Sequence, residues 1–359
     1  MLIFDLILAT RRPMTTGVER FGMLLFQAMR KLEPDTIAFV SDPSRLSERA
    51  GLIAVGDVYR GWLTLPLDLR RRGLRPRAVV CPTAPASPLF LATRDPLARI
   101  IHDVFPWTRA RAMPLRGRLL YRDVETLMAR RYDVLCGTSE IVAEELSGVL
   151  GREDIGWCGN AGSVYADRVT PRPLNGLPHE FVLAVGTVEP RKNYARLLEL
   201  ARAGGAGDLP IVLVGRPGWG DVVGEVERFA AQYPQKLVWL RDLSDDGVLL
   251  WLYQRAACFL TLSLAEGFNA PLAEAAACGR PTLCSDLPVH RIVAPPWSLF
   301  AAPEATAAEL RGQLRAAAAV APTPDAVEAY RRRYSFDAIA RRLDGLIDQA
   351  FAAAVAPAR

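Results

Sequence analysis

Residues 261–285 decide the fold of the chain, and they read TLSLAEGFNAPLAEAAACGRPTLCS. The apolar run 257–262 leads into this stretch and predicts a buried strand. Pro271 lies where the first turn of a helix accepts a residue without an N–H group. Gly279 and the proline two positions later end that helix, and the run 282–285 predicts a second strand. Strand, helix and strand in this order predict one unit of a parallel α/β sheet.

Two carboxylates flank the predicted helix start. Glu266 follows the first strand, and Glu274 lies on the first turn of the helix. Helix N-termini attract anions, and ligands of open α/β sheets bind beyond the carboxyl ends of the strands. The pair therefore predicts a ligand site, while a capping carboxylate beside a solvated surface glutamate stays open as the alternative.

The composition indicates a globular protein with two domains. The chain has 359 residues, of which 50% are hydrophobic and 23% charged, so each half can bury its own core. Residues 1–9 predict a first strand rather than a signal peptide, because they lack a basic leader and contain Asp5. Six cysteines without paired spacing indicate reduced thiols in a cytoplasmic protein, and three histidines leave little for a metal site.

The positive charge of the chain is concentrated in its N-terminal half. Residues 60–131 contain 15 arginines and 5 acidic residues. A solvated helix face explains the segment 107–131 as well as binding to an anionic surface does. We prefer the inner face of the cytoplasmic membrane as the partner of residues 60–131, so we expect a peripheral cytoplasmic protein. No aromatic and basic pattern typical of nucleic-acid binding accompanies the arginines.

Strands and helices alternate along both halves. The predicted strands are 1–9, 36–40, 52–55, 78–81, 99–102, 134–136, 181–186, 211–215, 237–240, 258–262 and 282–284. The predicted helices are 18–32, 140–150, 194–203, 222–232, 246–255, 271–278 and a broken helix over 325–354. The stretch 168–178 has three prolines and no periodicity, which is typical of a linker. We therefore predict doubly wound domains over 1–170 and 171–330, followed by a C-terminal helix within 331–359.

An adjacent pair of cations lies near the two glutamates in the predicted second domain. Arg191 and Lys192 precede the helix 194–203, where charge-assisted hydrogen bonds and the helix dipole act on the same anion. This arrangement suits a diphosphate, and the carboxylates Glu266 and Glu274 suit sugar hydroxyls. Together they predict a nucleotide-sugar pocket.

Two phrases, VGTVEPRKN over 185–193 and EGFNAPLAEA over 266–275, resemble the retaining glycosyltransferases of family 4. The resemblance extends to 101–103, 137–140, 242–245 and 285–288, so it spans nearly the whole chain. It implies the GT-B fold, in which two Rossmann-like domains with parallel sheets face each other across a cleft and the C-terminal helix returns to the N-terminal domain.

The resemblance also implies residue roles. Glu266, His102, Arg191 and Lys192 are the expected catalytic residues: the two cations stabilise the leaving diphosphate without a metal. The expected donor-binding residues are Gly17, Gly186, Leu240, Gly267, Phe268, Asn269, Ala270 and Glu274, together with the two cations. Asp103 and Ser139 are the expected acceptor-binding residues. Asn269 stands where the family often has a glycine, so the resemblance leaves open a contact between the hexose and a side chain.

The function implied by the resemblance is transfer of a hexose from a nucleotide sugar to a glycan or lipid-linked acceptor. The first choice is mannose from GDP-mannose, in the synthesis of a bacterial O-antigen, capsule or exopolysaccharide. A UDP- or dTDP-sugar donor, delivering glucose or rhamnose, is the alternative. A nucleotide-sugar epimerase and a non-catalytic scaffold are less favoured, because the phrase EPRKN and the four charged residues argue against them. No cofactor is expected beyond the nucleotide-sugar substrate.

Overall fold

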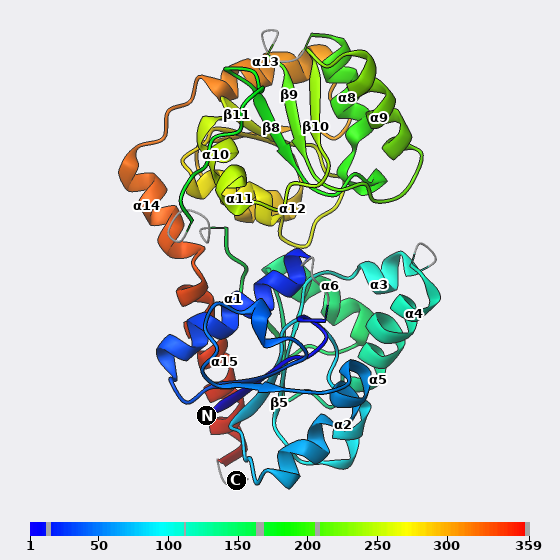
Figure 1. Cartoon of the computed structure of the whole chain (residues 1–359), viewed down its shortest axis with the longest axis vertical. Coiled ribbons are helices and arrows are strands. Elements are labelled where there is room, and N and C mark those ends of the chain that lie inside the picture. Colours follow the sequence, from blue (N-terminus) through cyan, green and yellow to red (C-terminus); the bar gives the residue numbers. More distant parts are fainter. Residues whose placement is uncertain (12–15, 111–112, 163–168, 205–208, 356–359) are drawn as a thin grey trace. The chain divides into compact units, whose positions relative to one another are not determined.

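The chain folds into two compact α/β units (Figure 1). The structure, a computed structural model, describes residues 1–11, 16–110, 113–162, 169–204 and 209–355, and no side chains beyond residue 352. Unit 1 comprises residues 1–160 and 336–359, and unit 2 comprises residues 161–335. The sequence places the divisions after residues 170 and 330, whereas the units divide after Asn160 and Ser335. Arg168, the first residue of the predicted linker, lies outside the described residues.

Unit 1 contains a fully parallel sheet, as the sequence predicts. Its strand order is β3-β2-β1-β4-β5-β6-β7, which is that of a doubly wound Rossmann-like sheet with one added edge strand. The strands are β1 (Leu2–Leu6), β2 (Ile37–Val40), β3 (Leu52–Ala54), β4 (Ala78–Cys81), β5 (Leu97–Ile101), β6 (Val134–Gly137) and β7 (Ile155–Trp157). The central strands are buried on both faces, which explains their continuous apolar runs.

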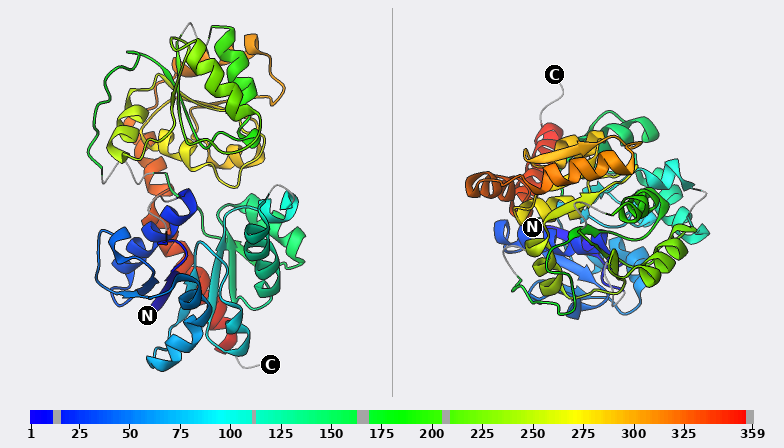
Figure 2. Two further views of the ribbon diagram at one scale, coloured as in Figure 1. Left: turned by 45° about the vertical axis from the view of Figure 1, so that its right-hand side comes forward. Right: turned by 90° about the horizontal axis from the view of Figure 1, so that it is seen from above.

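The helices of unit 1 cover both faces of this sheet (Figure 2). They are α1 (Gly17–Leu32), α2 (Val58–Arg71), α3 (Phe105–Thr108), α4 (Leu115–Arg118), α5 (Glu125–Met128), α6 (Glu140–Leu150) and α15 (Phe336–Val355). Two 3₁₀ turns, η1 (Pro43–Arg45) and η2 (Pro88–Ala92), and a π-helix, η4 (Leu119–Val124), complete the unit. Within the basic segment 107–131, the contiguous elements α4, η4 and α5 thus form one helical stretch with a π-helical middle part.

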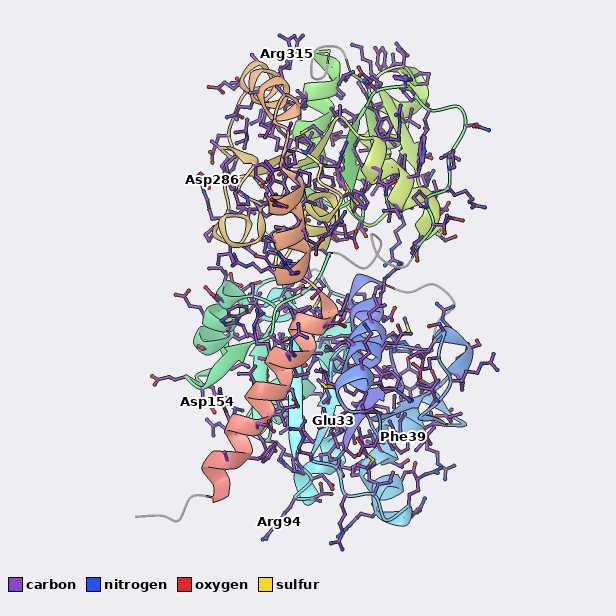
Figure 3. All side chains as sticks on the ribbon, turned by 90° about the vertical axis from the view of Figure 1, so that its left-hand side faces the viewer. Glu33, Phe39, Arg94, Asp154, Asp286 and Arg315 are labelled. Carbon is purple, nitrogen blue, oxygen red and sulfur yellow. The ribbon has the colours of Figure 1, made fainter. Side chains whose placement is uncertain are left out.

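The C-terminal helix α15 returns to unit 1, as predicted. It packs against α1 and β6 (Figure 3). Arg77, which precedes β4, forms ion pairs with Asp344 and Asp348 of this helix. Arg342 of α15 donates a 2.8 Å hydrogen bond to the carbonyl oxygen of Cys158 near β7. Several polar contacts therefore fix the helix in addition to its apolar face.

Unit 2 contains a six-stranded parallel sheet in the order β10-β9-β8-β11-β12-β13. Its strands are β8 (Val182–Val185), β9 (Ile211–Val214), β10 (Leu237–Leu240), β11 (Cys258–Thr261), β12 (Thr282–Ser285) and β13 (Ser298–Ala301). Its helices are α8 (Tyr194–Arg202), α9 (Val222–Gln232), α10 (Asp246–Arg255), α11 (Ala270–Ala277), α12 (Pro288–Val293), α13 (Ala307–Ala318) and α14 (Pro324–Arg333), with the 3₁₀ turn η5 (Pro190–Lys192) before α8. The sequence places most of these boundaries within one or two residues.

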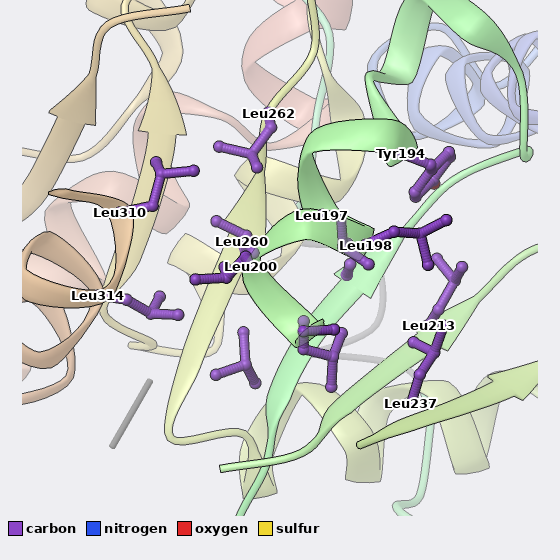
Figure 4. Close-up of a cluster of buried hydrophobic side chains, with 14 of the residues drawn as sticks. Tyr194, Leu197, Leu198, Leu200, Leu213, Leu237, Leu260, Leu262, Leu310 and Leu314 are labelled. Atoms are coloured by element: carbon purple, nitrogen blue, oxygen red, sulfur yellow. The ribbon is translucent and has the colours of Figure 1, made fainter. Parts of the chain in front are cut away.

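Leucines from helices and strands form the core on one face of the second sheet (Figure 4). Leu197 and Leu198 of α8 and Leu310 of α13 are buried against Leu213 and Leu260 of the strands. Apolar residues three and four apart on α8 and α13 give each helix one buried stripe. This packing holds α8, and with it the turn η5 at its N-terminus, firmly on the sheet.

Several elements were not predicted from the sequence, namely the strands β7 and β13 and the helices α2, α12 and α13. The strands β7 and β13 are short edge strands with few buried residues, so they show neither a long apolar run nor alternation. The helix α2 contains Pro66, which disguises its periodicity. The helix α13 reads as a low-complexity alanine stretch.

None of the described helices is long and apolar enough to cross a membrane. All six cysteines are free thiols, and five of them are buried, in agreement with the prediction.

The strand order reverses at one place in each sheet. In unit 1 the reversal lies between β1 and β4, and in unit 2 it lies between β8 and β11. The loops that leave such neighbouring strands diverge to opposite faces, so they open a crevice beyond the carboxyl ends of the strands. In unit 2 these loops are residues 186–189 before η5 and residues 262–269 before α11.

Candidate functional site

Two cations and one carboxylate meet at the strand-order reversal of unit 2. Arg191 and Lys192 come from η5, and Glu266 comes from the loop after β11. Glu266 Oε2 lies 2.6 Å from Arg191 Nη1, and Glu266 Oε1 lies 2.6 Å from Lys192 Nζ. The sequence predicted that these three residues belong to one site, and the fold brings their charged groups into direct contact.

The Glu266 carboxylate is ionised and fixed in position. Its side chain is only 5% exposed, and burial alone disfavours the charged form, but Lys192 and Arg191 outweigh it and lower the pKa of Glu266 to about 2. The hydroxyl of Ser263 donates a further 2.7 Å hydrogen bond to Glu266 Oε1. Arg191 also pairs with Glu189, at 2.8 Å. Each charge of the cluster is therefore compensated within unit 2.

Gly186 allows the close approach of the lysine at the end of β8. A Cβ atom on this residue would lie 3.3 Å from Lys192 Cε and 3.2 Å from the Tyr194 hydroxyl oxygen, and its φ of 153° is unfavourable for other residues. The Tyr194 hydroxyl donates a 2.9 Å hydrogen bond to the Gly186 carbonyl oxygen. Gly186 thus lies directly beside the charged cluster, where the sequence expects a donor-binding residue.

Glu274 is a buried residue of α11, so the solvated surface glutamate of the alternative interpretation is wrong. It is the fifth residue of the helix, just past the predicted first turn, and is 9% exposed. The Tyr253 hydroxyl on α10 donates a 2.8 Å hydrogen bond to Glu274 Oε2. Burial of a carboxylate is costly without such partners. Binding of a ribose by Glu274 stays a prediction.

The other expected donor-binding residues of unit 2 lie in two places. Gly267, Phe268, Asn269 and Ala270 form the turn between Glu266 and α11, with Ala270 as the first residue of the helix. Phe268 is buried against the ring of Tyr334 near the end of α14, at a centroid distance of 5.8 Å. Leu240 ends β10, and its carbonyl oxygen accepts a hydrogen bond from Gly215. Their contacts to a donor stay predictions.

His102 and Asp103 line a cavity of about 1020 Å³ in unit 1, beyond the ends of β4 and β5. His102 Nε2 lies 2.8 Å from the carbonyl oxygen of Pro82, which can only accept, so Nε2 carries the hydrogen and Nδ1 is the acceptor. Burial lowers the pKa of His102 to about 4, so the ring is neutral at pH 7. Asp103 is exposed and accepts a hydrogen bond from the N–H of Phe105.

Gly17 and Ser139, the two remaining predicted residues, begin helices in unit 1. Gly17 is the first residue of α1, and no atom of the described residues lies within 4 Å of where its Cβ would be. Ser139 caps α6 by accepting a hydrogen bond from the N–H of Val142. The predicted ligand contacts of both residues stay predictions.

The unit 1 cavity is mainly apolar, with an ion pair beside it. Its wall includes the aromatic residues Tyr59, Trp62, Phe105, Trp107 and Tyr121 and the leucines Leu8, Leu119 and Leu120. The guanidinium of Arg99 binds the carboxylate of Glu125 through two nitrogens, at 2.7 Å for the closer contact, and both side chains are almost completely buried. Tyr132 donates a 2.9 Å hydrogen bond to the same carboxylate.

Four residues that build these sites were not predicted from the sequence. Ser263 and His290 support the loop 262–269, and Arg99 and Glu125 form the ion pair beside the cavity. Ser263 and His290 carry no distinctive spacing. A charged pair 26 positions apart in apolar surroundings is a recognisable but ambiguous signal, because only the fold shows that the two residues meet.

Comparison with known proteins identifies the part of the chain that carries the charged cluster. Residues 172–323 match the profile of the family described as Glycosyl transferases group 1. These residues form a glycosyl transferases group 1 domain. Arg191, Lys192, Glu266 and Glu274 all lie within the matched range, so the resemblance found from the sequence is confirmed at this level.

Two relatives from Escherichia coli match part of the chain. The serotype-specific mannosyltransferase WbdA is 39% identical over 117 residues, which are 31% of this chain and 14% of that protein. The O-antigen chain mannosyltransferase B is 37% identical over 114 residues, which are 30% of this chain and 29% of that protein. The matches thus span less than a third of either relative.

The fold of the whole chain is similar to that of solved GT-B glycosyltransferases. The sucrose-phosphate synthase of Thermosynechococcus elongatus superimposes with a TM-score of 0.72 at 16% identity, over 98% of this chain and 99% of that structure. At this identity the likeness establishes the fold alone. It confirms the predicted pair of Rossmann-like domains.

Proposed function

We propose that the protein is a retaining, metal-independent glycosyltransferase that moves a hexose from a nucleotide sugar to a glycan or lipid-linked acceptor in bacterial polysaccharide synthesis. The observation that carries this proposal is the cluster of Arg191, Lys192 and Glu266 at the strand-order reversal of the group 1 domain. Ligands of doubly wound sheets bind at such a reversal. Two cations beside a fixed carboxylate suit a diphosphate with a sugar attached.

In the proposed reaction, Arg191 and Lys192 bind the donor diphosphate and stabilise the negative charge that develops as the bond to the anomeric carbon breaks. Glu266 serves two purposes: it orients both cations, and its carboxylate lies next to the positive charge that develops on the sugar ring. Glu274 binds the ribose hydroxyls. The backbone N–H groups of residues 268–270 bind hydroxyls of the transferred sugar.

Mannose is the proposed sugar and GDP-mannose the proposed donor. Both relatives from Escherichia coli are named as mannosyltransferases, which supports this choice. UDP and dTDP donors remain the second candidates, since no contact described in unit 2 selects a base.

A thermal-shift comparison of nucleotides tests the donor. We expect GDP to raise the melting temperature of the full chain more than UDP or dTDP at equal concentration, because a ligand that binds only the folded state stabilises it by about 2.7 kcal/mol at 100 times its Kd. Guanosine without phosphates serves as the control for the diphosphate contacts. A larger shift with UDP or dTDP contradicts GDP-mannose as the donor and favours the sugar nucleotide of that base. The absence of a shift with all three diphosphates contradicts the proposed binding of a nucleotide sugar.

The acceptor is proposed to carry an apolar part and to be reached at a membrane surface. The apolar cavity of unit 1 supports the first point. The second is supported by residues 59–127 of unit 1, which include eight of the twelve large hydrophobic residues that are exposed in the described chain: Tyr59, Leu63, Leu67, Leu89, Leu91, Leu115, Leu119 and Leu127. Exposed arginines accompany them, including Arg60, Arg70, Arg94, Arg116 and Arg130. Leucines insert at the interface, and arginines gain about 1 kcal/mol each near anionic lipid.

Vesicle sedimentation tests the membrane partner. We expect the full chain to sediment with anionic vesicles at low salt more than with neutral ones, and to be released as the salt concentration rises. The double change Leu63→Glu and Leu67→Glu on α2 weakens this binding. Val149→Glu on α6, which alters an exposed residue of the same unit outside residues 60–131, does not. Equal recovery on neutral and anionic vesicles contradicts the proposal.

A further inference from the structure

Asn269 occupies an unusual position in the turn between Glu266 and α11. Its φ of 70° lies in the left-handed region, where glycine and asparagine are the least strained residues. Its side chain points into the protein, because the residue is only 5% exposed. A glycine would satisfy the backbone equally well, so the backbone alone does not explain the amide.

Both amide hydrogens of Asn269 are used inside unit 2. Nδ2 lies 3.1 Å from Thr261 Oγ1 and 2.9 Å from His290 Nε2. His290 is completely buried on α12, and its Nδ1 lies 2.7 Å from the carbonyl oxygen of Ser285. Since a carbonyl oxygen can only accept, Nδ1 carries the ring hydrogen and Nε2 accepts from the amide. The histidine therefore fixes which way the amide faces.

The oxygen atom of this amide has no hydrogen-bond partner among the described residues. Asn269 Oδ1 is buried and accepts no hydrogen bond from any residue that the structure describes. Buried polar atoms are nearly always hydrogen-bonded, so an unpaired acceptor calls for a ligand or an ordered water. The amide cannot turn to relieve it, because Oδ1 would then face the lone pair of His290 Nε2.

Hydrogen bonds connect Asn269 to the charged cluster. Thr261 Oγ1 lies 3.3 Å from Ser263 Oγ, and Ser263 donates to Glu266 at 2.7 Å. The order of donors runs from the amide through the two hydroxyls to the carboxylate. The unpaired oxygen thus belongs to the network that holds the residue proposed to act on the transferred sugar.

We propose that Asn269 is a specificity-determining residue, that its Oδ1 accepts a hydrogen bond from one hydroxyl of the transferred sugar, and that His290 is the positioning residue that holds the amide in this orientation. This inference rests on the proposed function, because it needs a sugar at the loop 266–270. A sugar hydroxyl is the matching donor. A sugar that lacks this hydroxyl leaves the buried oxygen unpaired and is turned over about tenfold less efficiently or worse.

The first test is the tautomer of His290, which is independent of activity. The chain has three histidines, so their ring nitrogens are resolvable by ¹⁵N NMR of the full-length protein. We expect His290 to carry its hydrogen on Nδ1 at pH 7. In Asn269→Asp a carboxylate oxygen faces Nε2 of His290, so the ring takes up a second proton. The ¹⁵N signals of His290 then change to those of the doubly protonated ring. A wild-type His290 with its hydrogen on Nε2 overturns the inferred amide orientation.

The second test compares the intact sugar nucleotide with its mono-deoxy analogues. We expect wild type to discriminate about tenfold or more, in kcat/KM, against one analogue, and Asn269→Gly to lose this discrimination while keeping that against the others. His290→Phe weakens the discrimination against this analogue. His290→Gln restores part of it, because the glutamine amide oxygen accepts the hydrogen bond from Asn269 Nδ2. Asn193→Gly, a change at the other left-handed asparagine of unit 2, leaves the discrimination ratio unchanged.

The outcomes separate the two proposals. If wild type cleaves no sugar nucleotide, the proposed function fails, and this inference fails with it. If wild type is active and folded Asn269→Gly, checked by circular dichroism, discriminates against every analogue as wild type does, the sugar contact alone is overturned and the amide only packs the turn.

Discussion

Replacing Glu266 with glutamine is expected to separate binding from turnover. The variant keeps the shape of the side chain but removes the charge that Arg191 and Lys192 share. Both cations then become more available to a diphosphate, so nucleotide binds as tightly as in wild type or more tightly. Turnover of the sugar nucleotide falls by about 10²–10³-fold, since the fixed charge next to the reacting carbon is lost. Calorimetry and initial-rate kinetics measure the two quantities.

Lys192→Ala gives the complementary result, with weaker nucleotide binding and lower turnover together. Arg196→Ala is the matched control, because Arg196 is a cation on α8 that forms an exposed ion pair with Glu199 in the same unit. Such a pair contributes about 0–1 kcal/mol, so this variant resembles wild type. Turnover at the wild-type rate in both Glu266→Gln and Lys192→Ala contradicts the catalytic proposal.

The second large effect is expected for the ion pair beside the cavity of unit 1. In wild type the side chains of Arg99 and Glu125 are both almost completely buried. Glu125→Ala therefore leaves the buried guanidinium of Arg99 without its carboxylate partner. Removing one partner of such a pair costs about 3–5 kcal/mol of folding free energy. We expect amide hydrogens of β4, β5 and β6 to exchange correspondingly faster, as measured by mass spectrometry, while those of unit 2 keep their rates.

Two further variants test the cause of this destabilisation. The double change Arg99→Leu and Glu125→Leu removes both charges and is expected to cost less than Glu125→Ala alone. Arg71→Ala on α2 removes an exposed pair with Asp68 and is expected to change stability by less than about 0.5 kcal/mol. A double variant that is as unstable as Glu125→Ala indicates lost packing rather than an unpaired charge.

The sequence predicted the fold closely wherever burial dictates the residues. Strands in the middle of each sheet are apolar on both faces, and helix ends carry Gly279 or a capping residue such as Ser139, so both kinds of signal are local. The edge strands β7 and β13 are mostly half-buried and have no strong pattern, and these two were missed. The missed helix α2 shows that one internal proline is enough to hide a periodic pattern.

For the site, local sequence determined the residue types and tertiary structure decided their partners. The sequence by itself determined that Arg191, Lys192 and Glu266 follow two strands of one parallel sheet, because motif and strand pattern are contiguous in the chain. Only the tertiary structure decided that these strands are neighbours at the reversal of strand order, so that the three charges touch. It alone decided that Glu274 is buried and that His290 orients Asn269. Hydrogen bonds and ion pairs between distant residues depend on distances of about 3 Å, which no spacing along the chain encodes.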